Sequence, residues 1–282
     1  MGRQTSGFPN CGQSGYGSSL KVLAPGPISS NDSGNSMPSF SVILAAAGKS
    51  SRFNDPNFKK PFANLGRKPV WLYSAELFQK VRDVKQVILV ISPEDKDEFF
   101  ARFGPNIAVM GIDVVMGGAE RADSVEKGLA KVDSACDYVA IHDAARPCIS
   151  RDLIVSVFDA AVQHGAAIPA IPVNSTLKRS ASGDAIDETV DRSNLYQAQT
   201  PQAFKRELIQ ELYANRDGAQ PTDEAQLLEM NGQKVALVAG SPFNIKVTTS
   251  EDLRFAKACL DAMPVSKLDA PIHPFANDNL FR

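Results

Sequence analysis

Residues 45–60 place small residues and positive charges directly after an apolar run. Three alanines and Gly48 leave room for a ligand to lie against the backbone, and Arg52 and Lys60 add cations a few residues later. Such cations neutralise the charge of bound phosphate groups. The segment has neither the GxxxxGK[ST] nor the GxGxxG pattern of the commonest phosphate loops. The sequence therefore predicts a phosphate-binding loop of a different kind, with a solvated basic loop as the simpler alternative.

Two later segments have a similar composition. Residues 117–124 read GGAERADS and residues 142–147 read HDAARP, and each follows a short apolar run. Continuously apolar runs that alternate with helical patterns indicate a parallel sheet covered on both faces. Ligands bind such sheets at the loops that leave the carboxyl ends of the strands. We therefore expect the three segments to meet at one edge of the sheet and to form a binding site there.

The elements that must position these segments follow from hydrophobic periodicity. Strands are predicted at residues 41–47, 86–91, 113–116, 137–142 and 235–239, and helices at residues 70–81, 120–132, 153–163, 206–215, 223–231 and 250–260. The alternation ends after Pro172, where two short strand patterns flank the turn-rich residues 180–184. The prediction is an α/β, Rossmann-like fold: a mostly parallel sheet, helices on both faces, and a projecting β-hairpin arm at about residues 173–197.

The two ends of the chain differ from this domain in composition. Residues 1–38 are rich in Gly, Ser, Asn and Pro, which predicts a disordered N-terminal tail. The domain is expected at residues 39–262 and an irregular C-terminal tail at residues 263–282. We expect the functional domain to start near Met37, and we expect that translation can start there too. No secretory signal is expected, and plastid import is only a minor alternative to a cytoplasmic location.

Composition excludes several classes of protein. The net charge of -2 gives no reason to expect nucleic-acid binding. No apolar run reaches the ~20 residues that a membrane-spanning helix needs. The four cysteines, Cys11, Cys136, Cys148 and Cys259, are widely spaced, which is typical of reduced cytosolic thiols rather than of a disulfide framework or a zinc site.

Six motifs in order carry a resemblance to a known family. They are AAGKSSR at residues 46–52 with the lysines at 59–60, GGAERADSV at 117–125, HDAARP at 142–147, TVDR at 189–192, TPQ at 200–202 with TDE at 222–224, and NIKVT at 244–248. Together they closely resemble the 2-C-methyl-D-erythritol 4-phosphate cytidylyltransferases, a family of nucleotidyltransferases that activate sugar and polyol phosphates. Ser50 stands where that family has a second glycine, and Lys59 where it has a proline. The spacing to Leu65 and Gly66 favours Lys60 over Lys59 as the catalytic lysine.

The resemblance implies an activity and a set of site residues. CMP would pass from CTP to 2-C-methyl-D-erythritol 4-phosphate with release of pyrophosphate, in the non-mevalonate route to isoprenoid precursors. The implied cofactor is Mg²⁺, and the implied assembly is a homodimer that exchanges arms. By this resemblance, the catalytic residues would be Arg52 and Lys60. The residues that bind CTP would be Ala46, Ala47, Gly48, Gly118, Ser124, Asp143 and Lys246, and Asp143 would also be the candidate metal ligand. The residues that position the substrate would be Thr176, Arg192, Arg146, Thr200 and Thr222.

The reaction itself limits the residues that are needed. The attacking phosphomonoester is already anionic near neutral pH because its second pKa is about 6, so no general base is required. His142 is therefore expected to be structural, and Glu120, Asp123, Asp223 and Glu224 can be helix-start charges rather than ligands. Two alternatives stay open: a ribitol-5-phosphate cytidylyltransferase, and a non-catalytic CTP-binding protein. The missing GxGxxG pattern argues against a nicotinamide-dependent dehydrogenase.

Overall fold

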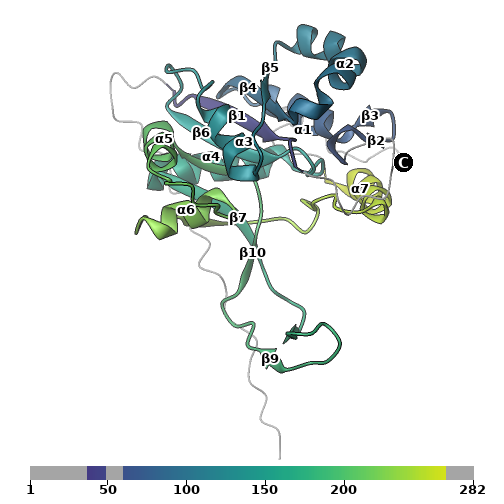
Figure 1. The fold of residues 1–282 in the computed structure, drawn as a ribbon, viewed down its shortest axis with the longest axis vertical. Helices are drawn as coiled ribbons and strands as arrows, with labels where there is room; N and C mark the ends of the chain where they lie inside the picture. Colours follow the sequence, from purple (N-terminus) through teal and green to yellow (C-terminus); the bar gives the residue numbers. More distant parts are fainter. Residues whose placement is uncertain (1–36, 49–59, 265–282) are drawn as a thin grey trace, which may run out of the picture.

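A computed structural model describes residues 37–48 and 60–264, with only the backbone of Lys60 included. The described residues form one large sheet with helices on both sides, two small two-stranded sheets, and an arm below the large sheet (Figure 1). The central strands are β1 (Phe40–Ala45), β4 (Val84–Ile91), β5 (Asp113–Met116) and β6 (Tyr138–Asp143). Their side chains are mostly apolar, and those of β1 are buried over nearly its whole length. This pattern is the one expected of strands covered on both faces.

The order of the strands brings the candidate loops together. The main path of the sheet is β10-β7-β11-β6-β1-β4-β5, in which β6, β1, β4 and β5 are parallel neighbours. The remaining strands are β7 (Ala166–Pro172), β10 (Tyr196–Ala198), β11 (Gln202–Lys205) and β12 (Ala236–Ala239). Strands β10 and β11 run antiparallel to β7, and β12 runs parallel to it. The sheet is therefore mostly parallel with two antiparallel insertions.

Two hydrophobic cores lie on opposite faces of the sheet. The helices are α1 (Val70–Gln79), α2 (Lys96–Met110), α3 (Arg121–Leu129), α4 (Arg151–His164), α5 (Arg206–Ala214), α6 (Glu224–Met230) and α7 (Ser250–Ala262). Val42 and Leu44 of β1 pack into the core shared by α1, α2 and α4, whereas Ile43 packs into the core shared by α3, α5 and α6. This alternation follows from the two-residue period of a strand. Helix α7 packs mainly in a third, smaller cluster.

Short elements connect this framework. They are the 3-10 turns η1 (Lys60–Phe62) and η2 (Pro93–Asp95) and the strand pair β2 (Asn64–Leu65) and β3 (Lys68–Pro69). Helix α3 approaches the sheet closely at Gly128, where a Cβ atom would lie 3.0 Å from a methyl group of Ile43. No helix in the described parts of the chain has the length and apolar character needed to cross a bilayer.

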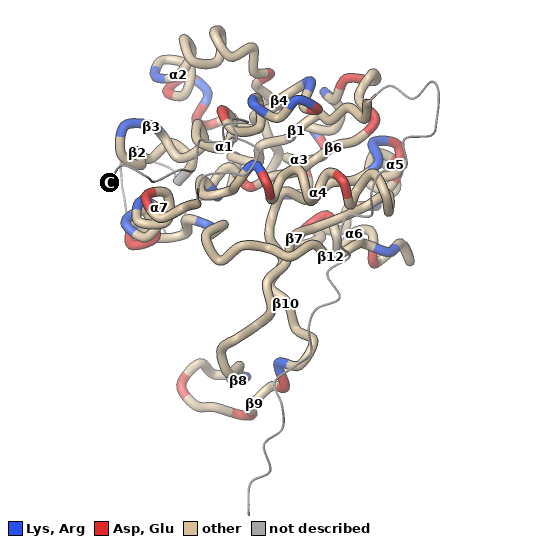
Figure 2. The backbone as a smooth tube through the Cα atoms, turned by 180° about the vertical axis from the view of Figure 1, so that it is seen from behind, with Lys and Arg blue, Asp and Glu red and all other residues tan. Residues whose placement is uncertain are grey.

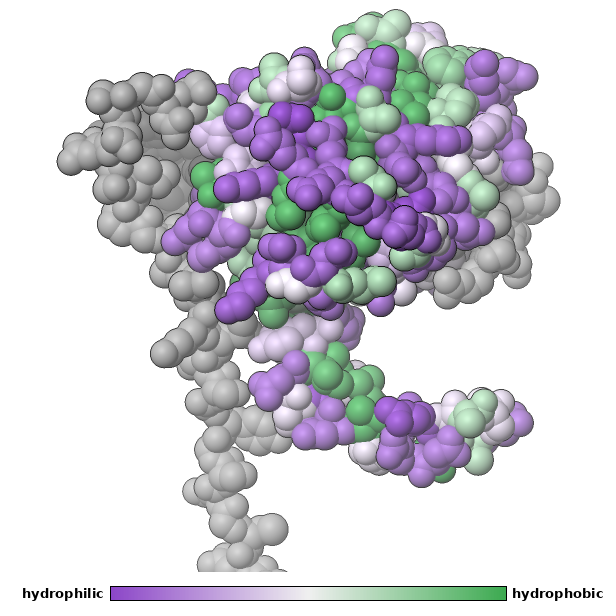
Figure 3. Space-filling view, turned by 60° about the vertical axis from the view of Figure 1, so that its left-hand side comes forward, coloured by the Kyte–Doolittle hydropathy of each residue, from purple (hydrophilic) through white to green (hydrophobic). Residues whose placement is uncertain are grey.

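The arm is a small hairpin that projects from the domain. Strands β8 (Leu177–Arg179) and β9 (Glu188–Val190) pair antiparallel, and an Arg179–Glu188 ion pair of 2.8 Å joins them. In the space-filling view the arm stands clear of the body of the domain and carries both polar and apolar side chains (Figure 3). Among the exposed apolar residues near it are Ile186 and Leu195.

The observed elements agree with the predicted fold class; the short strands β2 and β3 are unpredicted additions, and the other differences lie after residue 165. Helices and strands predicted before Pro172 are present within a few residues of their predicted ends. Strands β7, β10 and β11 were not predicted, because these short runs contain Pro, Gln and Lys and lack a clear alternation. They form only because β7 pairs with strands that are distant in the sequence.

Charges of both signs are interspersed along the backbone, as Figure 2 shows.

Candidate active site

The carboxyl ends of β1, β5 and β6 meet at one edge of the sheet, as predicted. Ala45 is paired with Asp143, and the N–H of Ala144 donates to the carbonyl of Ala45 at 3.1 Å. The N–H of Gly117, at the end of β5, donates to the carbonyl of Ile91 at 2.7 Å. A Cβ atom at Gly117 would lie 2.7 Å from the Cβ of Ala47. The three candidate segments are therefore neighbours in space as far as Gly48, where the first described stretch ends.

The loop between β5 and α3 is held by hydrogen bonds from its own side chains. The hydroxyl of Ser124 accepts a hydrogen bond from the N–H of Gly118 at 3.0 Å and is 3.0 Å from the carbonyl oxygen of Glu120. Ser124 is buried, so its hydroxyl bonds the loop backbone from the interior side. A Cβ atom at Gly118 would lie 2.4 Å from the Cβ of Asp123, which leaves no room for a side chain. Gly118 and Ser124 thus fix the backbone that borders the site.

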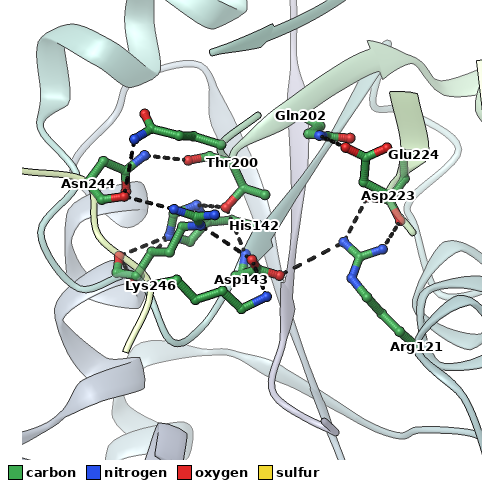
Figure 4. Close-up of polar contacts among 12 residues, drawn as sticks. Arg121, His142, Asp143, Thr200, Gln202, Asp223, Glu224, Asn244 and Lys246 are labelled. Carbon is green, nitrogen blue, oxygen red and sulfur yellow. Dashed lines mark hydrogen bonds and ion pairs between the residues drawn. The ribbon is translucent and has the colours of Figure 1, made fainter. Parts of the chain in front are cut away.

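Asp143 is the carboxylate around which the site is built. Its Oδ2 atom lies 2.8 Å from Nζ of Lys246 and 3.3 Å from Nε of Arg146, and its Oδ1 atom lies 3.9 Å from Nη2 of Arg121 (Figure 4). Burial by itself would raise the pKa of the Asp143 carboxyl, but Lys246, Arg121 and Arg146 together hold this pKa well below its usual range. Even with the carboxylate of Glu224, which also pairs with Arg121, the three cations outnumber the two carboxylates, and this excess of positive charge suits a phosphate-rich ligand.

Arg121 and Glu224 were not predicted as site residues. The guanidinium of Arg121 donates from Nη1 and Nη2 to the two carboxylate oxygens of Glu224, at 2.7 and 2.9 Å. The Glu224 side chain is 0% exposed and also accepts from the hydroxyl of Tyr213 at 3.0 Å. One sequence signal was available: a cation at the first position of a helix opposes the helix dipole, so Arg121 at the start of α3 needed a specific partner.

His142 and Thr200 form a buried network behind Asp143. The ring of His142 is fully buried, with Nδ1 at 3.1 Å from the hydroxyl of Thr200 and Nε2 at 3.2 Å from the carbonyl oxygen of Arg146. The same Thr200 hydroxyl accepts from the N–H of Asp143 at 3.1 Å. Thr200 is only 4% exposed, and its hydroxyl is therefore engaged by the protein. His142 has the expected structural position, and the geometry of Thr200 supports loop fixing rather than direct contact with a substrate.

The buried imidazole predicts a loss of stability in mild acid. Burial lowers the pKa of His142 to about 4, against 6.5 for an unperturbed histidine. Between these two values the unfolded chain binds a proton that the folded chain does not, so the free energy of unfolding falls as the pH falls, by about 3 kcal/mol in all. Urea titrations between pH 7 and 4.5 should show this decline in the parent and a flatter profile in His142→Asn. Equal slopes for the two proteins would contradict the prediction.

The other candidate residues fall into three groups. Ala46 is buried, Ala47 is half-buried and Gly48 is exposed, all just after β1. The side chains of Arg52 and Lys60 lie outside the described residues. Thr222 is exposed immediately before α6, whereas Thr176 and Arg192 lie in the arm, where Arg192 donates to the carbonyl of Asn174. Within one chain the arm that carries β8 and β9 points away from the sheet (Figure 1), so Thr176 and Arg192, which flank these strands, are not brought to Asp143 at the end of β6.

The capacity of the site for a divalent metal rests on one carboxylate. The described residues contain no group of three or more His, Cys, Asp or Glu side chains arranged to hold a metal ion. Asp143 is ionised, and among these residues its Oδ1 atom has only the 3.9 Å approach of Arg121. A single carboxylate with one oxygen open fits Mg²⁺ when substrate phosphates supply the other oxygen ligands.

The fold and the site define a class of protein. A Rossmann-like sheet whose strand-end loops place small residues and cations around a single carboxylate has the architecture of a nucleotidyltransferase that handles a nucleoside triphosphate. The model of the 2-C-methyl-D-erythritol 4-phosphate cytidylyltransferase family matches residues 40–262. The chain therefore belongs to this family.

Individual relatives agree with the family assignment. A 2-C-methyl-D-erythritol 4-phosphate cytidylyltransferase of Rhodopirellula baltica is 42% identical over 238 residues, which cover 80% of this chain and 97% of that protein. The crystal structure of the synthase of 4-diphosphocytidyl-2C-methyl-D-erythritol from Anaerococcus prevotii superposes with a TM-score of 0.66 at 30% identity, covering 79% of this chain and 96% of that one. The cytidylyltransferase of Thermus thermophilus gives a TM-score of 0.63 at 32% identity, over 77% and 96% of the two chains.

Proposed function

We propose that this protein transfers CMP from CTP to 2-C-methyl-D-erythritol 4-phosphate and releases pyrophosphate. The observation that carries this proposal is the cluster of Lys246, Arg146 and Arg121 around Asp143, because it is built from family motifs that are distant in the sequence and adjacent in space. Family membership favours this reaction over ribitol-5-phosphate activation and over a protein that only binds CTP.

The reaction requires charge neutralisation more than proton transfer. An oxygen of the substrate phosphate forms a bond to the α-phosphorus of CTP, and the bond from that phosphorus to the bridging oxygen of pyrophosphate breaks. Negative charge grows on the transferred group and on the leaving pyrophosphate, so fixed cations lower the barrier. His142 is buried and its ring nitrogens are engaged, which agrees with a mechanism that uses no general base.

Individual residues can be assigned parts of this task. Arg52 and Lys60 are proposed to stabilise the transition state and the departing pyrophosphate, and Lys246 to help position phosphate groups. The backbone at Gly118, which is hydrogen-bonded to Ser124, is proposed to receive the cytidine together with Ala46, Ala47 and Gly48. Thr222 is exposed just before α6, whose first residue, Glu224, is bonded to Arg121, and it is proposed to contact the polyol phosphate. Arg146 holds the loop that carries Lys246, through a 2.8 Å bond to the carbonyl of Asn244.

Mg²⁺ is the proposed cofactor, with Asp143 as its protein ligand. When bound with CTP, the ion would neutralise the triphosphate and favour departure of pyrophosphate. Asp143 is suited to this because its carboxyl is ionised at all working pH values. We place the reaction in the cytoplasm, where reduced thiols persist, since the described cysteines Cys136, Cys148 and Cys259 are free and buried.

A homodimer with exchanged arms is the proposed assembly. In the single chain, Thr176 and Arg192 lie just outside β8 and β9 of the arm, which projects away from the sheet in which Asp143 ends β6 (Figure 1). Ile186 is 65% exposed and Leu195 is 39% exposed, and such apolar side chains gain stability when a partner covers them. An arm that reaches the neighbouring subunit would bring Arg192 to the partner's phosphate-binding site.

A substrate panel tests the function. Purified protein is incubated with CTP, Mg²⁺ and one acceptor at a time, and released pyrophosphate is measured. Turnover should be fastest with 2-C-methyl-D-erythritol 4-phosphate and much slower with ribitol 5-phosphate or with UTP in place of CTP. Faster turnover with ribitol 5-phosphate would reassign the substrate, and CTP binding without pyrophosphate release would favour a non-catalytic protein.

Mixing two impaired variants tests the exchanged arm. Arg192→Ala should raise the KM for the polyol phosphate more than the KM for CTP, because Arg192 is proposed to contact the acceptor only. Arg52→Ala should lower turnover. If the arms are exchanged, refolding Arg192→Ala together with Arg52→Ala should yield heterodimers with one intact composite site, and activity should exceed the sum of the two variants. Activity that equals the sum would contradict arm exchange, and Arg192→Ala refolded with itself is the control.

A further inference from the structure

Glu224 is a fully buried carboxylate to which the reaction assigns no role. Its two carboxylate oxygens accept hydrogen bonds from Nη1 and Nη2 of Arg121, and the hydroxyl of Tyr213 donates a third hydrogen bond. Burial and the charge of Glu224 raise the pKa of Tyr213, so this hydroxyl remains a proton donor. An ion buried to this degree keeps a fixed geometry because moving either partner would leave an uncompensated charge. The guanidinium plane of Arg121 is therefore set by Glu224.

The same guanidinium faces the active-site carboxylate from a longer distance. Nη2 of Arg121 is 2.9 Å from Glu224 but 3.9 Å from Oδ1 of Asp143, which is beyond hydrogen-bond range. Oδ2 of Asp143, in contrast, is engaged by Lys246 at 2.8 Å and by Arg146 at 3.3 Å. In Figure 4 Arg121 lies between the two acidic side chains. Glu224 and Asp143 thus compete for one cation, and Glu224 holds it.

We propose that Glu224 is a positioning residue that restrains Arg121 and so keeps Oδ1 of Asp143 open for the divalent cation that CTP brings. This inference rests on the proposed function and on Asp143 as a metal ligand. Without the charge of Glu224, Arg121 closes on Asp143 and occupies Oδ1. Outer partners of this kind set the affinity of a metal site without touching the metal.

The test compares CTP binding with and without magnesium. Isothermal titration calorimetry gives the affinity for CTP in Mg²⁺ and in EDTA, and the ratio of the two affinities is the Mg²⁺ enhancement. Glu224→Gln should reduce this ratio by about 10- to 100-fold while CTP still binds in EDTA. Glu76→Gln is the matched control, since it makes the same change in an ion pair with Lys68 elsewhere on the surface, at 2.5 Å. Its ratio should equal that of the parent.

A double variant separates restraint from packing. In Arg121→Gln/Glu224→Gln no guanidinium remains to occupy Oδ1, so the Mg²⁺ enhancement should return toward the parent value. If Glu224→Gln does not fold, as judged by circular dichroism, the double variant decides alone, and a lost enhancement there overturns the proposal. An unchanged ratio in Glu224→Gln, or a double variant as impaired as the single one, also overturns it. A parent protein that binds no CTP would overturn the function itself, whereas one that binds CTP without Mg²⁺ enhancement would overturn this inference and the metal role of Asp143 but not the transfer of CMP.

Discussion

Arg52→Ala and Lys60→Ala should each lower kcat by roughly 30- to 900-fold, which corresponds to about 2–4 kcal/mol of barrier. The reaction builds negative charge on the transferred phosphate and on pyrophosphate, and fixed cations in this first loop are the groups proposed to meet it. Because the stabilisation is needed mainly in the transition state, KM for CTP should change less than kcat. Steady-state kinetics with pyrophosphate detection measure both quantities.

Matched variants make this result interpretable. Arg67 is exposed in the turn between β2 and β3, and Lys257 lies on the surface of α7 with Asp261 as its partner. Alanine at either position should leave kcat within about twofold of the parent, because surface substitutions away from a site have small effects. Thermal unfolding should be unchanged in all four variants. If Lys59→Ala abolishes turnover while Lys60→Ala does not, the catalytic lysine is Lys59 and the register of the loop shifts by one residue.

Arg121→Met should destabilise the fold by about 3–5 kcal/mol, because it leaves the carboxylate of Glu224 buried without its cationic partner. The side chain of Glu224 is 0% exposed, so water cannot replace the two lost hydrogen bonds without opening the region where α3, α5 and α6 meet. Urea unfolding followed by circular dichroism gives the change in the free energy of unfolding.

A second variant distinguishes the lost charge pair from lost packing. Arg121→Met/Glu224→Leu removes both charges and should recover most of the stability, since well-packed apolar residues often replace a buried ion pair without cost. Lys257→Met is the surface control; it breaks an exposed pair with Asp261 and should cost less than about 1 kcal/mol. A loss below about 1 kcal/mol for Arg121→Met would contradict the view that this pair is a structural constraint.

The positions of the motifs relative to the strands could be predicted because they depend on local patterns. Apolar runs such as residues 86–91 form strands wherever they can be covered, and the loops that follow parallel strands share an edge of the sheet. These local patterns are sufficient to predict that Ala47, Gly117 and Asp143 lie close together. The helix-start alternative for Asp123 and Asp223 was also correct: Asp123 completes a capping box, and Asp223 accepts from the N–H of Gln226 at 2.9 Å.

Contacts between segments distant in the sequence could not be predicted in this way. Thr200 is 57 residues from Asp143 and Glu224 is 103 residues from Arg121, and no local pattern encodes either contact. Glu224 looked like an ordinary acidic residue at a helix start. The packing of α6 against α5, next to the start of α3, buries it and makes it the partner of Arg121. For the same reason Thr200, a plausible substrate contact from its motif, has its hydroxyl within the buried network.

The sequence by itself determined the class of fold, the family motifs and the kind of chemistry, since residue type and spacing along single strands and loops carry that information. The tertiary structure decided which oxygen of Asp143 is engaged, which cation is restrained, and which candidates stay apart in a single chain, because these depend on how separate elements pack. The arm is the clearest case: the sequence places Thr176 and Arg192 beside its two short strands, and only the fold shows that the arm projects away from the sheet of its own chain.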